Sequence, residues 1–230
     1  MTPEREAQAV AARYARRGNS DRYSMLRPEV WQTVQERQRA LLGLFAQAGL
    51  QDLSRLRLLE VGCGAGGNLL ELLRLGFAPE HLAGIELLGE RLARARAVLP
   101  EALRLHGGDA LHAGVAPGSL DIVYVSTVLS SLLDDAYQQR LADAMWSWLA
   151  PGGAVLCYDF TVNNPRNPDV RGVPLQRLRE LFPAGRMRQR RITLAPPLAR
   201  MLVRVHPALY RTANALPWLR THVLAWIAKA

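Results

Sequence analysis

The pattern of apolar and polar residues changes along this chain of 230 residues. From about Arg55 onward, short apolar runs alternate with stretches in which apolar residues recur at helical spacing. The runs predict strands and the spaced stretches predict helices, an alternation typical of a parallel sheet with helices on both faces. We expect strands at residues 56–61, 82–86, 103–107, 120–125 and 153–159, and helices near residues 67–76, 88–98 and 134–149.

Two helices are predicted ahead of this alternation. Residues 3–17 read as an exposed helix, and residues 18–21 form a polar break. A second helix runs from Pro28 to about Ala48, because its apolar residues repeat at helical spacing and proline suits the first helical turn. We therefore expect residues 1–50 to form an N-terminal helical cap.

The last third of the chain predicts a helix at residues 173–182 and strands at residues 187–194 and 221–229. Residues 196–220, between the two strands, are apolar and basic. Two interpretations remain open: a helix at a membrane interface, or packing against the sheet or a second subunit, which we favour. Without an internal repeat or a low-complexity linker, we expect one domain over residues 1–230.

A glycine-rich turn at residues 62–67 joins the first predicted strand to its helix. Strand, glycine turn and helix together bring bare backbone N–H groups and a helix N-terminus against a ligand. Gly62, Gly64 and Gly67 fit the dinucleotide pattern G-x-G-x-x-G, and with Gly66 the first two also fit G-x-G-x-G. A tight turn without a ligand could use the same glycines.

The features that follow the turn favour one family. Glu60 precedes the glycines, Glu86 ends the second strand and Asp109 follows the third. A further strand leads to Ser126, and a turn lies within Leu149–Leu156. Through these features the chain resembles the class I, Rossmann-like, S-adenosylmethionine (SAM) methyltransferases. This resemblance covers residues 55–160, the expected SAM-binding core. It implies an α/β fold with a seven-stranded, mostly parallel sheet and an antiparallel strand seven. NAD-type domains lack that strand, so the strand predicted at residues 221–229 favours the methyltransferases.

The resemblance also implies the cofactor site. The glycine turn would receive the methionine end of SAM, the second strand its ribose, the segment after the third strand its adenine, and the end of the fourth strand the methyl donor. The expected cofactor-binding residues are Glu60, Gly62, Cys63, Gly64, Gly66, Asn68, Glu86, Leu87, Asp109, Ala110 and Ser126.

We expect the acceptor site in the polar loop after the fifth strand, within residues 158–173. A hydroxyl nucleophile needs a base, and Asp159 is the first candidate and His106 the second. The expected substrate-binding residues are Tyr23, Asn163, Asn164 and Arg166. Asn-Pro turns alone could explain the asparagines, and Tyr23 could be a plain packing residue.

Charge is distributed unevenly. The net charge is +9, made of −2 over residues 1–160 and +11 over residues 161–230. This asymmetry suggests a phosphorylated or nucleotide-linked substrate, nucleic acid or a membrane surface. A solvated basic face in an arginine-rich protein is an equally good interpretation, since Lys229 is the only lysine.

Cys63 and Cys157 are the only cysteines, and they predict small buried residues in a reducing compartment. No signal sequence and no apolar run long enough for a membrane span is visible, so we expect a cytoplasmic protein. The five histidines are scattered and predict no metal centre, although a magnesium site with ligands distant in sequence stays open.

The predicted function is O-methylation of a small molecule or a sugar-containing metabolite, with S-adenosylhomocysteine as the second product. Residues 125–128 lack the Asn/Asp-Pro-Pro-aromatic motif of DNA N-methyltransferases, which disfavours a nucleic-acid partner. An RNA methyltransferase and a SAM-binding regulatory protein without turnover remain alternatives.

Overall fold

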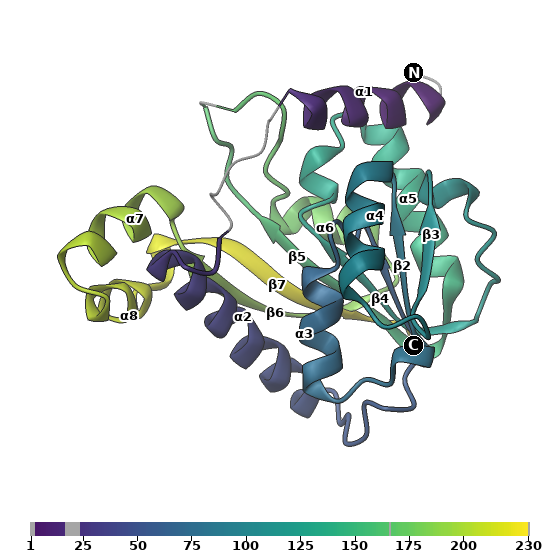
Figure 1. Ribbon diagram of the computed structural model, residues 1–230, viewed down its shortest axis with the longest axis horizontal. Coiled ribbons are helices and arrows are strands. Elements are labelled where there is room, and N and C mark those ends of the chain that lie inside the picture. Colours follow the sequence, from purple (N-terminus) through teal and green to yellow (C-terminus); the bar gives the residue numbers. More distant parts are fainter. Residues whose placement is uncertain (1–2, 17–23, 166, 230) are drawn as a thin grey trace.

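The computed structural model describes residues 3–16, 24–165 and 167–229, and it has one seven-stranded sheet with helices on both faces (Figure 1). The sheet order is β3-β2-β1-β4-β5-β7-β6, in which β7 runs antiparallel to β5 and β6. This confirms the expected α/β fold with its antiparallel strand seven. The strands are β1 (Leu58–Val61), β2 (Leu82–Glu86), β3 (Arg104–Gly107), β4 (Leu120–Ser126), β5 (Leu149–Phe160), β6 (Arg186–Leu194) and β7 (Arg220–Ala228).

The burial of each strand follows its place in the sheet. The central strand β1 is buried at all four positions, because helices cover both of its faces. The outer strand β6 exposes Arg186, Arg188 and Arg190 along the first part of its length. Charged side chains on an edge strand discourage pairing with another chain, so these arginines have a structural use at the sheet edge.

The helices divide into two layers. In one layer α5 and α6 pack on the sheet through residues such as Leu141, Met145 and Leu178, and in the other α2, α3 and α4 pack through residues such as Leu44, Leu69 and Ala95. The helices are α1 (Pro3–Ala15), α2 (Pro28–Gln47), α3 (Gly67–Leu75), α4 (Gly89–Val98), α5 (Asp135–Trp148), α6 (Leu175–Leu181), α7 (Pro196–Val205) and α8 (Ala208–Asn214). Among the described residues, none of these helices has the length and apolar character needed to cross a membrane.

The two N-terminal helices do not form one cap. Helix α1 lies over the end of the sheet from which α4 and α5 begin, whereas α2 lies along a sheet face (Figure 1). Arg13 of α1 donates to the Ser131 carbonyl at 2.9 Å, and Glu6 accepts from the Leu133 amide at 2.9 Å. Helix α2 buries Leu41 and Phe45 against the sheet instead. The chain before β1 therefore supplies one cover and one layer of the core.

The segment between β6 and β7 folds into α7 and α8, which pack on α2 rather than on the middle of the sheet. Leu194, Ala199 and Tyr210 form a small core of their own. The Glu36 carboxylate of α2 accepts hydrogen bonds from the Tyr210 hydroxyl at 3.1 Å and the Asn214 amide at 2.7 Å. The inner side of this segment is therefore packed, against α2 and the end of β6.

Candidate functional site

The candidate site lies at the carboxyl ends of β1, β2 and β4. Strand β1 lies between β2 and β4, the helix that follows β1 covers one sheet face, and α5, which follows β4, covers the other. Open α/β sheets bind ligands at the point where the connections turn to opposite faces. The glycine turn after β1 lies at this point.

Glycine is required in this turn by backbone conformation and by close contacts. Gly62, Gly64 and Gly66 have φ angles of 69°, 60° and 85°, in the left-handed region. A Cβ at Gly62 would lie 2.5 Å from a Val128 methyl carbon, and a Cβ at Gly64 would lie 2.9 Å from the Arg91 guanidinium. No side chain caps the N-terminus of α3, so its first amide groups face the turn and suit an anionic group.

Glu60 is a buried carboxylate with one oxygen that has no hydrogen-bond partner. One oxygen accepts from the Asn68 amide at 2.6 Å, and the other has no hydrogen-bond partner. Burial raises the pKa of Glu60 to about 8, opposed by the Asn68 hydrogen bond and the Arg37 guanidinium. A buried acid of this kind suits a cationic ligand group, which would supply the missing partner and favour the ionised form.

Glu86 connects the end of β2 to the glycine turn. Its carboxylate accepts from the Gly64 amide at 2.7 Å and from the Leu88 amide at 2.9 Å. Leu87 lies between Glu86 and Leu88 in the chain. An ionised carboxylate offers about four acceptor positions, and these amides use two of them. Glu86 can therefore still accept the two hydroxyls of a ribose.

Asp109 lies at the start of a 3-10 turn with Ala110 buried behind it. One oxygen accepts from the Leu111 amide at 3.0 Å and from the Tyr137 hydroxyl at 2.6 Å, and the other lies 3.8 Å from a ring nitrogen of His112. Burial, together with the neighbouring carboxylate, raises the pKa of Tyr137. Tyr137 of α5 was missed from the sequence, because nothing local links it to a residue 28 positions earlier.

These residues fit the cofactor that the sequence resemblance implies. SAM has a carboxylate, an ammonium, a sulfonium, two ribose hydroxyls and an adenine amine. The uncapped start of α3 suits the carboxylate, and the unpartnered oxygen of Glu60 suits a cationic group. Glu86 and Asp109 keep acceptor positions for the hydroxyls and the amine. Cys63, also expected here, is buried against Gly84, where a Cβ would lie 2.8 Å from its sulfur.

Helix α1 and Arg91 cover the glycine turn. The Arg91 guanidinium lies 5.1 Å from the centre of the Tyr14 ring, and it also borders Gly64. Arg13 and Glu6 pair at 2.7 Å, and both hold the segment after β4. The cover therefore contacts both the glycine turn and the segment after β4.

Asp159, the expected base, lies inside the protein. It is fully buried, and its two oxygens accept from the Ser130 amide at 3.0 Å and the Phe160 amide at 2.9 Å. Burial raises its pKa to about 7. Ser126 ends β4, and Thr127 follows with a φ of 54°, a strained conformation for a branched residue. Asp159 therefore holds the strained turn after β4 in place.

His106, the second candidate base, lies far from Asp159. His106 is an exposed residue of the edge strand β3, whereas Asp159 is in β5. Strands β2, β1 and β4 lie between them, and four strand spacings are about 19 Å. Nearness of the two residues could not be judged without the sheet order.

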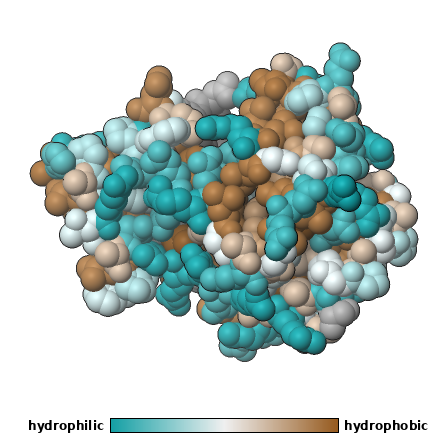
Figure 2. Space-filling view, turned by 90° about the horizontal axis from the view of Figure 1, so that it is seen from below, coloured by the Kyte–Doolittle hydropathy of each residue, from teal (hydrophilic) through white to brown (hydrophobic). Residues whose placement is uncertain are grey.

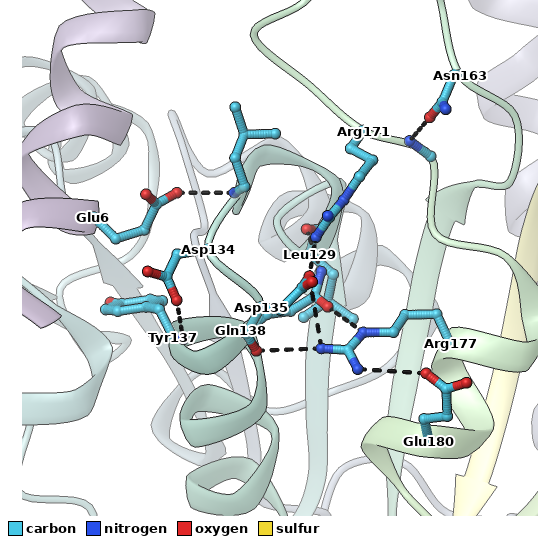
Figure 3. Close-up of polar contacts among 12 residues, drawn as sticks. Glu6, Leu129, Asp134, Asp135, Tyr137, Gln138, Asn163, Arg171, Arg177 and Glu180 are labelled. Atoms are coloured by element: carbon cyan, nitrogen blue, oxygen red, sulfur yellow. Dashed lines mark hydrogen bonds and ion pairs between the residues drawn. The ribbon is translucent and has the colours of Figure 1, made fainter. Parts of the chain in front are cut away.

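The loop after β5 is closed by its own polar groups (Figure 3). The Asn163 side-chain oxygen accepts from the Gly172 amide at 2.8 Å, a bond across the loop rather than within a local Asn-Pro turn. Asn164 lies beside it, whereas Tyr23 and Arg166 fall outside the described residues. A cleft of about 330 Å³ opens beside the loop, and Arg171 and Arg177 at its rim both pair with Asp135.

A second group of polar side chains was missed from the sequence. On the sheet face under α2, the Tyr158 hydroxyl lies 2.9 Å from the Thr193 hydroxyl, and the Tyr158 ring stacks on His222 at 5.1 Å. The Arg37 guanidinium lies 5.2 Å from the same ring. Thr193 has a φ of 65°, and burial lowers the pKa of His222 to about 4. We call Arg37, Tyr158, Thr193 and His222 the α2-side polar cluster.

Alternation along the strands was the available signal for this cluster. Glu60, Tyr124, Tyr158 and His222 all point to the face under α2, because successive strand residues alternate between faces. Strand pairing, which the sequence does not give, brings them into neighbouring positions. Within the described part of the chain, no group of His, Cys, Asp and Glu is arranged to hold a metal ion.

Comparisons with known proteins agree with this geometry. Residues 58–153 match the model of a methyltransferase domain family. A SAM-dependent methyltransferase from Thermotoga maritima, described as a possible histamine N-methyltransferase, has a similar structure, with a TM-score of 0.65, 14% identity, and coverage of 97% of this chain and 100% of that one. A SAM-dependent methyltransferase from Mesorhizobium loti has a TM-score of 0.58, 16% identity, and coverage of 80% and 95%.

The same fold occurs with another chemistry. The [4+2]-cyclase SpnF has a TM-score of 0.59, 17% identity, and coverage of 85% of this chain and 81% of that one. No curated protein matches the chain in sequence. The reaction must therefore be argued from the site itself, because identities this low reflect the fold alone.

Proposed function

We propose that the chain is a SAM-dependent methyltransferase and that it methylates a hydroxyl oxygen of a small molecule or a sugar-containing metabolite. The observation that supports this proposal is the α2-side polar cluster. Arg37 acts electrostatically on Glu60 of the cofactor site and lies against Tyr158, so polar groups continue from the cofactor to the ends of β5 and β7. The acceptor would lie along this route.

The chemistry of the cluster suits a hydroxylated or anionic acceptor. SAM supplies an activated methyl group, so the protein must align the acceptor oxygen and exclude water. The hydroxyls of Tyr158 and Thr193 can donate and accept hydrogen bonds, and His222 stays neutral above about pH 5 because burial lowers its pKa to about 4. The Arg37 guanidinium is paired with Glu71 at 2.9 Å, and its charge disfavours a protonated amine close to it.

The turn after β4 would press against the acceptor from the other side. Thr127 donates its amide to the Tyr158 carbonyl at 2.8 Å, so the turn and the cluster are joined through β5. Asp159 fixes the same turn through Ser130. We therefore propose Asp159 as a positioning residue, with Asn163 and Asn164 shaping the loop at the rim of the site.

The test is incubation with SAM carrying a ¹³C-methyl group and a fractionated metabolite extract, followed by mass analysis. The ¹³C chemical shift of the product distinguishes an O-methyl from an N-methyl or C-methyl group. His222→Ala and Thr193→Val should lower turnover while SAM affinity stays within about twofold, or roughly 0.4 kcal/mol. An N-methyl product, or full turnover in both variants, would contradict the proposal.

An RNA acceptor is the alternative, and the charge of +11 over residues 161–230 favours it. Binding through phosphate contacts would weaken steeply with salt. Methyl transfer to RNA, with an affinity that falls as salt rises, would replace the small-molecule proposal.

A further inference from the structure

The outer side of α7 and α8 is an exposed surface that the methyl-transfer site does not use. Helices α7 and α8 lie at the end of the molecule farthest from β3 (Figure 1), and their outer side combines apolar side chains with arginines. Figure 2 shows hydrophobic residues among hydrophilic ones at the left end, where these helices project. We call this surface the α7–α8 face and define it by Arg200, Met201, Arg204, Val205, Arg211 and Trp218.

Its apolar residues are more exposed than packing would leave them. Val205 is 75% exposed, Trp218 is 73% exposed and Met201 is 57% exposed. Met201 and Val205 are four residues apart on α7, so they form one stripe along the helix. The opposite side of α7 is the packed one, since Ala199 is buried against Tyr210. The exposed stripe therefore does not contribute to the packing of the fold.

The basic residues form a second stripe beside the first. Arg200 and Arg204 are also four residues apart, and Arg211 is exposed on α8. Residues 181–230 contain nine basic residues and no Asp or Glu. The neighbouring acid of α2, Glu36, already accepts hydrogen bonds from Thr193, Tyr210 and Asn214. The surface therefore has a positive field that its described surroundings do not neutralise.

We propose that the α7–α8 face docks on an anionic lipid bilayer. Aliphatic side chains can enter the acyl boundary while arginines pair with anionic headgroups, which is how interfacial helices bind. Trp218 suits the interface because its ring is apolar and its N–H is polar. Leu26, 93% exposed just before α2, adds an apolar group near the same end of the molecule, because Thr33 of α2 contacts Tyr210 of α8 at 3.1 Å.

Two other occupants fit the face less well. Nucleic acid would use the arginines and Trp218 but has no place for Met201 and Val205, since single strands offer charge and aromatic stacking. A second copy related by a twofold axis would bring the same arginines against one another, because such an interface is self-complementary. The mixture of aliphatic and basic stripes favours a bilayer.

The test is flotation of the full chain with phosphatidylcholine vesicles and with vesicles that also contain phosphatidylglycerol. We expect binding to the anionic vesicles at low salt and at least tenfold weaker binding in Val205→Asp. Val98→Asp is the matched control, since Val98 is 52% exposed on α4. Val98→Asp should bind the anionic vesicles as the parent protein does. The parent protein should bind the neutral vesicles weakly.

A charge series separates the arginines of this face from overall charge. Arg200→Gln/Arg204→Gln/Arg211→Gln should lose most binding, whereas the exposed control set Arg96→Gln/Arg104→Gln/Arg179→Gln should lose little. Three outcomes would overturn the proposal. The two arginine sets could lose vesicle binding equally, Val205→Asp and Val98→Asp could lose it equally, or the parent protein could fail to bind anionic vesicles. A dimer of the parent protein that Val205→Asp disperses would overturn it too, because that result assigns the face to self-association.

Discussion

The two faces of the sheet bury polar groups in different ways. Under α5 and α6, the Asp159 carboxylate has both oxygens bound by backbone amides. Under α2 and α3, one oxygen of Glu60 and one nitrogen of Arg37 are buried without a hydrogen-bond partner. An unmet buried polar group costs about 1–3 kcal/mol. The comparison teaches that Asp159, with both oxygens bound, serves the fold, whereas the free oxygen of Glu60 can still accept a hydrogen bond from a ligand.

The largest effect should come from the turn between the two faces. Gly62→Ala forces a side chain to a φ of 69° and to within 2.5 Å of Val128. Strain and overpacking together cost about 2–4 kcal/mol, so SAM affinity measured by calorimetry should fall at least thirtyfold.

Gly67→Ala is the matched control for that experiment. Gly67 lies in α3 without a left-handed φ, and a Cβ there meets nothing within 4 Å. Its SAM affinity should stay within about twofold, or roughly 0.4 kcal/mol. If both variants keep full affinity and a normal thermal transition, the glycine turn does not receive the cofactor.

The second effect tests the unmet carboxylate. Glu60→Gln should weaken SAM binding by about 1.5–3 kcal/mol, the scale of hydrogen bonds to charged groups. Because the pKa of Glu60 is raised to about 8, a cationic ligand must displace a proton at lower pH. Calorimetry between pH 6 and pH 9 should therefore show SAM affinity rising towards about pH 8 in the parent protein, but not in the variant.

The same residue makes folding stability depend on pH. The unfolded pKa of glutamate is about 4.3, so between that value and about 8 the folded state keeps a proton that the unfolded state releases. The free energy of unfolding should therefore fall as pH rises through this window. Asp159 contributes in the same direction up to about pH 7. Denaturant melts of Glu60→Gln should show a shallower fall, most clearly above pH 7.

A third effect tests the sheet face under α5 and α6, where both oxygens of Asp159 are bound. Asp159→Asn replaces one accepting oxygen by an amide nitrogen, which cannot bind the Ser130 or Phe160 amide. The turn after β4 should loosen, so turnover should fall about tenfold, or roughly 1.4 kcal/mol, while SAM affinity changes little. Asp143→Asn, an exposed change on α5, is the control. Unchanged turnover in Asp159→Asn would remove its positioning role, and rescue at high pH would restore the base interpretation.

The smallest effect concerns the loop after β5. Asn163→Ala removes one hydrogen bond to Gly172 and should lower the free energy of unfolding by about 0.5–1.5 kcal/mol. If the asparagine only closes the loop, turnover per folded molecule should stay within about twofold, or roughly 0.4 kcal/mol. A large loss of turnover at unchanged stability would instead place the acceptor against Asn163.

The sequence was informative wherever a feature is local. The glycine turn, Glu60 and the alternation of strands and helices predicted the fold and the cofactor side, because each depends on neighbours in the chain. The distance between His106 and Asp159 could not be predicted, because strand order depends on long-range pairing. The α2-side polar cluster was missed for the same reason, since Arg37, Tyr158 and His222 come from three elements that only the folded sheet brings together.

The position of β7 has a consequence for synthesis. Strand β7 is the last strand in chain order, yet it lies between β5 and β6. A nascent chain that has emerged as far as Leu194 has made six strands, but β6 has no neighbour and β5 presents an open edge. Until residues 220–228 leave the ribosome, the arginines along β6 should discourage that strand from pairing with another chain.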